Sequence, residues 1–545
     1  MYLFNYETIS KTKRNFSDIA GESFDLIVIG GGIVGTGIAR DAALRGLRTL
    51  LVEKEDFAYG TTSRSSRLIH GGLRYLRMLE FRLVWQDLHE REILLNIAPH
   101  LVHKLQFIIP LLRSEPLYRL TLPFGLRLYD MLARGKSLPS CRRFSQRETL
   151  ELEPCLSETD GLVGSYLYYD CAVEFMERLC LENAVDAAEH GACILNHAAM
   201  TDLLQDGAVQ GLRVKDVLSE EEYLANGRIV LNAGGPWADL VWDKLNVSKT
   251  DGLRKTKGIH LLTSKISNNA LVLFAKSDGR LFFVIPWQDH SLIGTTDTDY
   301  TGDLDAVNAD ASDVNYLVSE IRNYFPRFKQ KDIYYTMAGL RALVAAEGKS
   351  ASNTSRTHKL VDHERRNGIK GLISVLGGKI TAYRAIAEEA VDLVCRKLGL
   401  RVPCGTAHTP LPGAPSVQMQ TIDQAAQASG LSVETVAHLV VLYGSRFSSV
   451  LDCIRGDKRL GQPISSSCRD ILAQIKYAVD EEEALTVSDF LLRRSAVGLG
   501  PSQGLDAVET VAQEMGLLLG WSSTERQNQI DSYRALANLG RRFTE

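Results

Sequence analysis

Hydrophobic positions follow two different patterns along this 545-residue chain. From residue 24 to about 400, short apolar runs rich in β-branched residues alternate with segments of helical periodicity, which is typical of an α/β (α+β) fold. Beyond 416 the periodicity is helical throughout, and it predicts an all-helical domain (416–545) with helices at 433–443, 466–479, 487–494, 508–519 and 525–539. A Pro-rich linker is predicted between the two parts at 401–415, which contains Pro403, Pro410, Pro412 and Pro415.

The stretch 24–53 has the pattern of strand, glycine turn, helix and second strand. Gly30, Gly32 and Gly35 form G-x-G-x-x-G after the first strand, and Glu53 stands at the tip of the second. Such a turn lets a pyrophosphate approach the N-terminus of the helix, and the acid accepts hydrogen bonds from ribose hydroxyls. The pattern therefore predicts a site for FAD or NAD rather than NADP, against the alternative of a purely structural glycine turn.

The segments after Glu53 indicate a second domain interleaved with the first. The hydroxyl-rich stretch 59–76 is either a surface linker or a binding loop for the second half of a large cofactor. The pattern then predicts helices at 81–98 and 174–190, and strands near 192–197, within 208–231, within 254–300 and at 334–337. A strand, a Gly-Gly turn and a helix over 371–394 return the chain to the first domain. We expect an inserted mixed-sheet substrate domain, at about 100–160 and 240–345.

Residues 105–134 combine apolar and aromatic side chains with arginines and few acids. Such a segment can lie in a membrane interface. The alternative is a pair of core helices whose arginines are solvated. The arginines are Arg113, Arg119, Arg127 and Arg134.

Composition narrows the class of protein. The net charge of −4 gives no overall attraction to nucleic acid. Nine cysteines without a C-x-x-C pair argue for a reducing compartment and against a disulfide framework or a zinc site, and we expect no bound metal. The predicted N-terminal extension, 1–23, has no apolar core of a secretory signal, and no apolar run reaches about 18 residues. We expect a cytoplasmic protein, or one attached to a membrane from the cytoplasmic side.

Several motifs together resemble those of one family. They are FDLIVIGGGIVGTGIA, TTSRSSRLIHGGLRYL, NAGGPWAD, IPW with IGTTDTDY, GLRAL, SVLGGKITAYR and VSDFLLRRSAVGL. The chain is similar over 24–540 to FAD-dependent glycerol-3-phosphate dehydrogenase, the quinone-linked enzyme of the glycine-oxidase-like flavoprotein superfamily. The resemblance implies a Rossmann-like FAD-binding domain and hydride transfer from C2 of sn-glycerol 3-phosphate to FAD. It also implies a homodimer on the cytoplasmic face of the inner membrane, seated through about 105–134, which passes electrons to quinone.

The same resemblance implies the roles of individual residues. His70 and His260 are the candidate bases, without a choice between them, and Arg341 is the candidate for polarising the substrate hydroxyl; Ala342 stands where the family usually has proline. The implied substrate-binding residues are Arg74, Tyr75, Arg356, Lys379 and Thr381. The implied FAD-binding residues are Gly30, Gly32, Ile33, Gly35, Glu53, Thr62, Ser63, Gly72, Leu73, Ala233, Gly234, Trp237, Gly378 and Thr381.

Three other functions compete with this one. A soluble glycerol-3-phosphate oxidase shares these motifs and passes electrons to oxygen, producing peroxide. An oxidoreductase acting on an amino acid, such as a glycine oxidase, would not need so many cations around one site. A flavin-bearing sensor without turnover would not need His70, Arg74, Arg341 and Lys379 together. The basic, apolar segment 105–134 favours the quinone-linked dehydrogenase over the oxidase.

Overall fold

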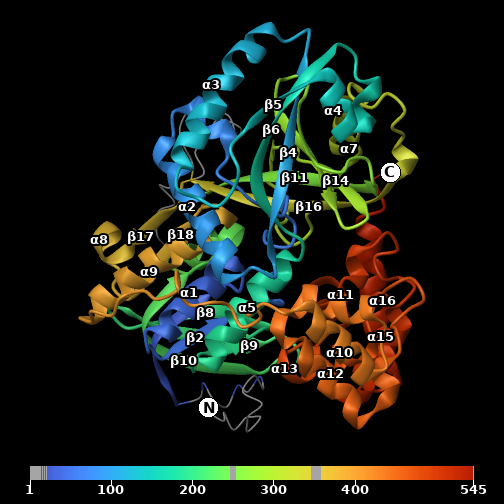
Figure 1. The fold of residues 1–545 in the computed structure, drawn as a ribbon. Helices are drawn as coiled ribbons and strands as arrows, with labels where there is room; N and C mark the ends of the chain where they lie inside the picture. The colour runs from blue at the N-terminus through green and yellow to red at the C-terminus, as the bar shows by residue number, and fades with distance from the viewer. Residues whose placement is uncertain are drawn as a thin grey trace.

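The computed structural model describes residue 14, residue 16, residue 19 and the ranges 21–245, 253–344 and 357–543. It contains two sheets and a helical C-terminal domain (Figure 1). Arg356 lies outside the described residues, as does the side chain of Arg74.

The first sheet has the strand order β17-β18-β10-β1-β2-β7. Along this order the strands run parallel except for β17, which pairs antiparallel with β18, and β9 adds antiparallel to β10. The helices α1 (Ile33–Leu44), α5 (Met176–Glu189) and α9 (Tyr383–Leu398) pack on one face, and the hairpin β8–β9 contributes to the core on the other. The strand bounds are β1 Ser23–Ile29, β2 Thr49–Val52, β7 Cys193–Leu195, β8 Ala198–Gln205, β9 Val209–Asp216, β10 Glu222–Asn232, β17 Lys359–Asp362 and β18 Leu372–Leu376.

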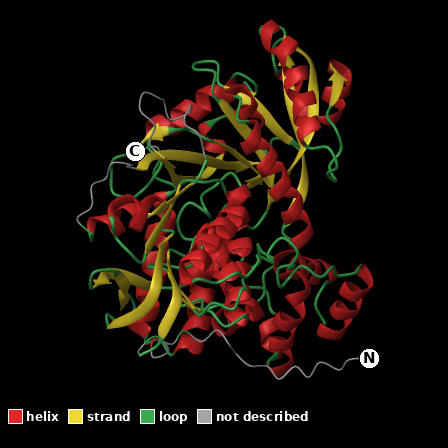
Figure 2. Ribbon diagram, turned by 90° about the vertical axis from the view of Figure 1, so that its left-hand side faces the viewer, coloured by secondary structure: helices red, strands yellow, loops and turns green. Residues whose placement is uncertain are grey.

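The second sheet forms the upper part of the molecule in Figures 1 and 2. Its order is β15-β11-β14-β13-β12-β4-β6-β3, and β16 and β5 pair with β11 and β6. Both parallel and antiparallel pairs occur, so the sheet is mixed, as the sequence predicts. Its strands are β3 Leu68–Ile69, β4 Val102–Leu112, β5 Arg142–Ser145, β6 Leu162–Val173, β11 Leu253–Ser264, β12 Ala270–Phe274, β13 Leu281–Trp287, β14 His290–Gly294, β15 Thr298–Asp299 and β16 Ile333–Val344.

Four helices accompany the second sheet: α2 Phe81–Ile97, α3 Pro116–Leu132, α4 Gln146–Leu152 and α7 Ala311–Arg322. The sheet uses β6 as far as Val173, past the expected limit near 160. The predicted helix at 81–98 corresponds to α2, and the predicted helix at 174–190 corresponds to α5.

The segment 105–134 contains a strand and a helix rather than a pair of helices. Residues 102–112 form β4, an interior strand between β12 and β6, whose Phe107, Ile108 and Ile109 are buried. This half is therefore a buried strand and not a core helix. An apolar run buried on both faces of a sheet has no strand periodicity, which is why the pattern could not distinguish it from a helix. Only the second half is helical, as α3.

The C-terminal domain is helical. Its helices are α10 Met419–Ser429, α11 Val433–Tyr443, α12 Phe447–Gly456, α13 Leu472–Glu481, α14 Val487–Asp489, α15 Val508–Leu519 and α16 Ser523–Leu539, and α14 continues as a π-helix over Phe490–Arg494. Residues 401–415 contain no helix or strand. The sequence did not predict α10 or α12, and it began α13 six residues early, at 466 rather than 472. In the described ranges, no single helix is long and apolar enough to cross a membrane, and one bent pair, Met419–Ser429 with Val433–Gly456, passes by length and composition.

Candidate active site

A cavity of about 840 Å³ lies where the two sheets meet. Its wall is formed by the ends of β1 and β2, the 59–70 loop, the Gly-Gly-Pro-Trp turn after β10, strands β11 and β16, and the turn after β18. Most of the residues expected at the site from the sequence line this cavity. They are Gly30, Gly32, Ile33, Glu53, Thr62, His70, Gly72, Leu73, Tyr75, Ala233, Gly234, Trp237, His260, Arg341, Gly378, Lys379 and Thr381.

The glycine turn packs too tightly for side chains. Gly30 has φ +104°, and a Cβ there would lie 2.7 Å from the carbonyl oxygen of Ala233. A Cβ on Gly35 would lie 1.8 Å from the carbonyl oxygen of Gly30, so α1 can approach β1 only with glycine at this position. The hydroxyl of Thr62 accepts a hydrogen bond from the backbone N–H of Ile33 at 3.1 Å, which holds the hydroxyl-rich loop against the first turn of α1.

Glu53 lies beside this turn, at the end of β2. Its carboxylate accepts hydrogen bonds from the backbone N–H of Gly31 at 2.6 Å and from that of Glu55 at 2.9 Å. Burial raises the pKa of Glu53 above its usual value. A helix N-terminus, a glycine turn open to the cavity and an acid at the adjacent strand end are the donor set that a dinucleotide requires, so these residues fit FAD.

His70 and Thr381 meet across the cavity. The backbone N–H of His70 donates to the Thr381 hydroxyl at 3.1 Å, which ties the loop of the second sheet to the turn after β18. The His70 ring packs edge-on against Phe283, with ring centroids 6.4 Å apart. His70 therefore lies between the two domains with its ring partly exposed.

Lys379 has a buried acidic partner that the sequence analysis missed. Its ammonium group forms an ion pair with Asp87 of α2 and lies 4.2 Å from the ring centroid of Tyr75. Asp87 is fully buried, and burial raises its pKa to about 6. An acid on the buried face of a predicted helix was the available signal, because such a residue needs a cationic partner.

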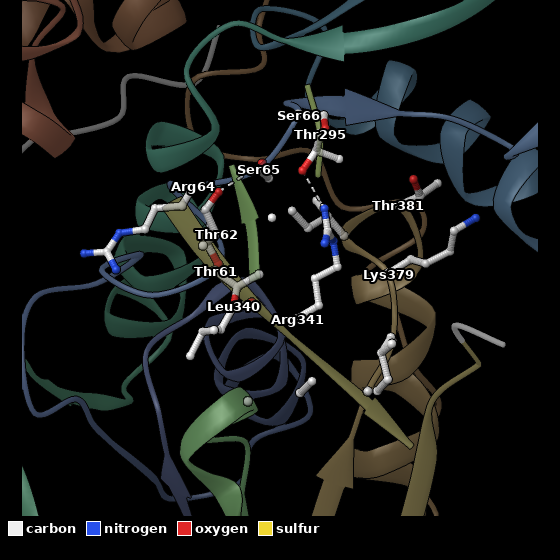
Figure 3. A pocket seen from close by; sticks show the side chains of 18 of the residues that line it. Thr61, Thr62, Arg64, Ser65, Ser66, Thr295, Leu340, Arg341, Lys379 and Thr381 are labelled. Atoms are coloured by element: carbon white, nitrogen blue, oxygen red, sulfur yellow. Dashed lines mark hydrogen bonds between the residues drawn. The ribbon is translucent and has the colours of Figure 1, made fainter. Parts of the chain in front are cut away.

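Arg341 extends from β16 over Gly258 of β11, where a Cβ would lie 2.2 Å from its guanidinium. Its guanidinium donates to the Thr295 hydroxyl at 2.7 Å, and to the Thr296 carbonyl oxygen and the Asp297 carboxylate at 3.1 Å each. Figure 3 shows Arg341 reaching toward Thr295, with Thr61 and Thr62 on one side and Lys379 and Thr381 on the other. The 295–297 segment that fixes the guanidinium belongs to the IGTTDTDY motif, but the sequence analysis gave its residues no role.

His260 lies on β11, and its ring is buried. Its Nε2 is 2.8 Å from the hydroxyl of Ser66, and its Nδ1 has no hydrogen-bond partner in the part of the chain that the structure describes. Burial, together with the charges of Arg341 and Arg67, lowers the pKa of His260 to about 3. The imidazole is therefore neutral at physiological pH.

The turn that follows His70 rests on a buried network. Asp170 of β6 accepts hydrogen bonds from Arg91 at 2.5 Å and from the Tyr129 hydroxyl at 2.7 Å. The Tyr129 oxygen in turn accepts the backbone N–H of Gly71 at 3.0 Å. These three side chains come from α2, α3 and β6, and they fix the position of His70 through the backbone.

Comparison with known proteins identifies the family. Residues 25–384 match the family described as FAD dependent oxidoreductase, and residues 404–526 match the C-terminal domain of alpha-glycerophosphate oxidase. Glycerol-3-phosphate dehydrogenase from Synechocystis is 39% identical over 540 residues, covering 95% of this chain and 97% of that protein. Aerobic glycerol-3-phosphate dehydrogenase from Staphylococcus haemolyticus is 34% identical, covering 96% and 95%. The chain belongs to the FAD-dependent glycerol-3-phosphate dehydrogenase family.

Solved structures show the same fold. Glycerol-3-phosphate dehydrogenase from Bacillus halodurans, complexed with FAD, aligns with a TM-score of 0.79 at 29% identity and covers 96% of each chain. Glycine oxidase from Geobacillus kaustophilus aligns over 71% of this chain with a TM-score of 0.51 at 20% identity, which is a likeness of fold alone. FAD is thus the cofactor of this glycerol-3-phosphate dehydrogenase family member, and the fold class expected from the sequence is confirmed.

Some residues predicted for the site lie elsewhere or outside the description. Gly35 packs behind the turn rather than lining the cavity. Ser63 donates its hydroxyl to the Tyr59 carbonyl oxygen at 3.2 Å, within its own loop. Arg74 belongs to the 3₁₀ helix Leu73–Met78, its side chain undescribed, and Arg356 lies outside the described residues.

Proposed function

We propose that this protein oxidises sn-glycerol 3-phosphate to dihydroxyacetone phosphate and passes the electrons to membrane quinone. The observation that carries the proposal is the placement of Arg341, His70 and Lys379 in the same cavity as the dinucleotide turn. Relatives named glycerol-3-phosphate dehydrogenase, which align over nearly the whole chain, support the choice of substrate. FAD supplies a hydride acceptor when it is bound.

Arg341 suits the role of holding the substrate hydroxyl. A guanidinium fixed by three oxygen atoms is preorganised, and it stabilises negative charge that develops on an oxygen without further rearrangement. Its partner Asp297 lowers the net charge at this position, so Arg341 acts here through directed N–H groups rather than as an isolated cation.

His70 is the better candidate for accepting the hydroxyl proton. A general base works best when its pKa is near the working pH, and the pKa of His260 is about 3. His260 is also buried, with Nε2 occupied by Ser66. His70 is partly exposed and lines the cavity, between Thr381 and Phe283. We assign the proton to His70 and a positioning role beside Arg341 to His260.

The substrate phosphate requires cations. We propose Lys379 with Tyr75 and Thr381 on the described side of the cavity, together with Arg74 and Arg356 as the family resemblance implies. Because Asp87 is ionised above pH 6, the Lys379 pair carries little net charge at neutral pH. Lys379 then contributes N–H donors, and the arginines supply most of the charge that a dianion needs.

The choice of quinone as acceptor rests on α3. One face of this helix exposes Leu117, Leu120, Phe124 and Met131, while Tyr118, Thr121, Leu122 and Gly125 line the cavity. The apolar exposed face, with Arg119 and Arg127 on the same helix, suits an anionic lipid interface. We propose that α3, rather than the whole of 105–134, seats a homodimer on the cytoplasmic face of the inner membrane, close to quinone.

A glycerol-3-phosphate oxidase that uses oxygen is the second candidate. The match of residues 404–526 to a domain described from alpha-glycerophosphate oxidase favours it. Anaerobic stopped-flow spectroscopy decides between the two. Glycerol 3-phosphate should bleach the flavin absorbance within seconds, and a soluble quinone should then reoxidise it at least about tenfold faster than air-saturated buffer. Faster reoxidation by oxygen, with stoichiometric peroxide, would favour the oxidase, and failure to bleach would refute both.

A further inference from the structure

The segment 487–499, which contains α14 and the π-helix Phe490–Arg494, lies outside the cavity. Its two adjacent arginines are nevertheless buried, with side-chain exposures of 7% for Arg493 and 0% for Arg494. Buried guanidinium groups require an anion, because leaving a charge unpaired in the protein interior is costly. The anion comes from the nucleotide domain, more than 430 residues earlier in the chain.

That anion is Asp56, which is fully buried. Arg494 donates from Nη2 to Asp56 Oδ1 at 2.9 Å and also from Nη1 to Oδ2, while Arg493 donates from Nε to Oδ2. Asn196, just after β7, donates to Oδ1 at 3.0 Å. The arginines are fixed on their own side, because Asp489 accepts from Arg493 at 2.7 Å and the Glu482 carbonyl oxygen accepts from Arg494 at 2.8 Å.

Asp56 belongs to the 53–58 loop, which packs against the glycine turn of the FAD site. Glu53 accepts the N–H of Gly31 at the start of this loop, and at its end the N–H of Ala58 donates to the Gly31 carbonyl oxygen at 3.0 Å. Between them the Phe57 ring packs against Gly31, since a Cβ on Gly31 would lie 2.7 Å from it. The 53–58 loop therefore contains Glu53, the acid expected to bind the ribose, and holds Gly31 of the glycine turn in place.

We propose that Arg493 and Arg494 are positioning residues for FAD: they hold the 53–58 loop through Asp56, so that the C-terminal domain completes the cofactor site without touching the cofactor. A carboxylate bound by two guanidiniums and an amide has little freedom to move. Loosening Asp56 frees Glu53 and Gly31 together, and FAD dissociates faster. By linkage, bound FAD strengthens the contact between the two domains to the same extent.

The test compares two buried arginines of the same interface. Arg494→Met removes a donor to Asp56 and leaves Arg493 as its counter-ion. Arg178→Met is the control. Arg178 of α5 binds Glu482 of the C-terminal domain at 2.7 Å and is similarly buried, and within the described residues its hydrogen bonds and ion pair go to Leu442 and Glu482 rather than to the 53–58 loop. Each holoenzyme is diluted into buffer, and the release of FAD is followed by the rise in flavin fluorescence. The unfolding temperature of each FAD-stripped protein is measured in parallel.

We expect Arg494→Met to release FAD about tenfold faster than the wild type or more, within the usual range of coupling between sites. Arg178→Met should release FAD within about twofold of the wild-type rate, even where its stripped form unfolds at a comparably lower temperature. Equal release rates for the two variants would overturn the proposal, because interface stability alone would then explain the effect. Should Arg494→Met not fold, Asp56→Asn, which keeps the shape of the side chain, decides by the same comparison.

Discussion

Arg341 shows how a single residue is preorganised by its neighbours. Replacement by alanine leaves the dinucleotide turn, Glu53 and Thr62 untouched, so FAD should stay bound. The rate of flavin reduction by glycerol 3-phosphate should fall by about 100-fold to 1,000-fold, the effect of losing one preorganised donor to a developing oxyanion. Anaerobic stopped-flow absorbance measures this rate.

The matched control for Arg341 is Arg280→Ala. Arg280 lines the same cavity and pairs with Asp278. It also donates to the backbone carbonyl oxygen of Asp297 at 2.9 Å, and its removal leaves the side-chain partners of Arg341 in place. This variant should reduce FAD within about threefold of the wild-type rate. An Arg341→Ala enzyme that reduces FAD as fast as Arg280→Ala would exclude the role proposed for Arg341.

The lowered pKa of His260 predicts how the stability of the protein depends on pH. Its pKa is about 3 in the folded protein and near 6.5 when unfolded, so between these values the unfolded state binds the extra proton. The stabilisation is present above pH 6.5 and is lost as the pH falls toward 3. Wild type should lose up to about 1.4 kcal/mol per pH unit relative to His260→Gln in this window. Urea unfolding from pH 7 to pH 4.5 measures it, and parallel curves for the two proteins would contradict the assignment.

At the scale of elements, helix α2 places an acid beside Lys379, which lines the cavity. Asp87, with a pKa of about 6, is ionised at pH 7.5 and offsets the charge of Lys379. Asp87→Asn removes this negative charge, so a dianionic substrate is attracted more strongly and its KM should fall about threefold to tenfold at pH 7.5. The gap between variant and wild type should close below pH 6, where Asp87 is already protonated.

Steady-state assays from pH 5 to pH 8 test this dependence on Asp87. Glu90→Gln is the control, because Glu90 lies on the same helix and pairs with Arg384, which does not line the cavity. A KM ratio between Asp87→Asn and wild type that is constant over the whole pH range would show that Asp87 does not act through its charge.

Helix α3 carries the membrane proposal. Replacing Leu117, Leu120 and Phe124 by serine removes three exposed apolar side chains, each worth about 1.5–3 kcal/mol when fully buried in an apolar phase. Co-sedimentation with vesicles that contain anionic lipid should fall to near background. Flavin reduction by glycerol 3-phosphate should be unchanged, because these side chains do not line the cavity. Leu517→Ser, exposed on α15, is the control and should still sediment. Unaltered binding by the triple variant would exclude α3 as the contact.

Local patterns predicted those elements whose neighbours in sequence are also their neighbours in space. The turn from β1 into α1 was readable because glycine spacing and helical periodicity occur together within 30 residues. Strand β4 was not readable, because burial on both faces removes its alternation. Helices α10 and α12 do have amphipathic patterns, since Ile422 and Ala426 are buried four residues apart and Phe447, Val450 and Ile454 share one face, so the sequence analysis overlooked them.

The residues of the candidate site also fall into two groups, those that the sequence predicted and those that it did not. Motifs marked the residues that face the cavity, including His70, Arg341 and Lys379. Of the residues that orient them, Asp87 and Asp170 come from other elements and carry no motif of their own. Asp297 lies in the IGTTDTDY motif, which did not reveal its partner. Their pairing depends on how the two sheets and α2 approach each other, which no local spacing encodes.

For the whole molecule, the C-terminal helices share a core with the second sheet. One continuous apolar cluster contains Trp287 and Tyr335 from the sheet and Tyr443 and Tyr533 from the helices. Two hydrogen bonds also join the domains. The Tyr335 hydroxyl donates to the Leu499 carbonyl oxygen at 3.0 Å, and the backbone N–H of Thr336 donates to the Gly540 carbonyl oxygen at 2.8 Å. A domain joined only by a linker would have no such shared interior.

This shared core predicts a single cooperative unfolding transition for the full chain. Separating the C-terminal domain would expose Tyr335 and leave Asp56 and Arg494 without each other as ion-pair partners. We therefore expect neither part to be stable without the other. Differential scanning calorimetry should give one peak, with calorimetric and van't Hoff enthalpies that agree. Added FAD should move the whole peak to higher temperature, because a ligand of the native state stabilises everything that unfolds with its site. Two resolved peaks, with FAD shifting only one of them, would show that the C-terminal domain folds independently of the cofactor site.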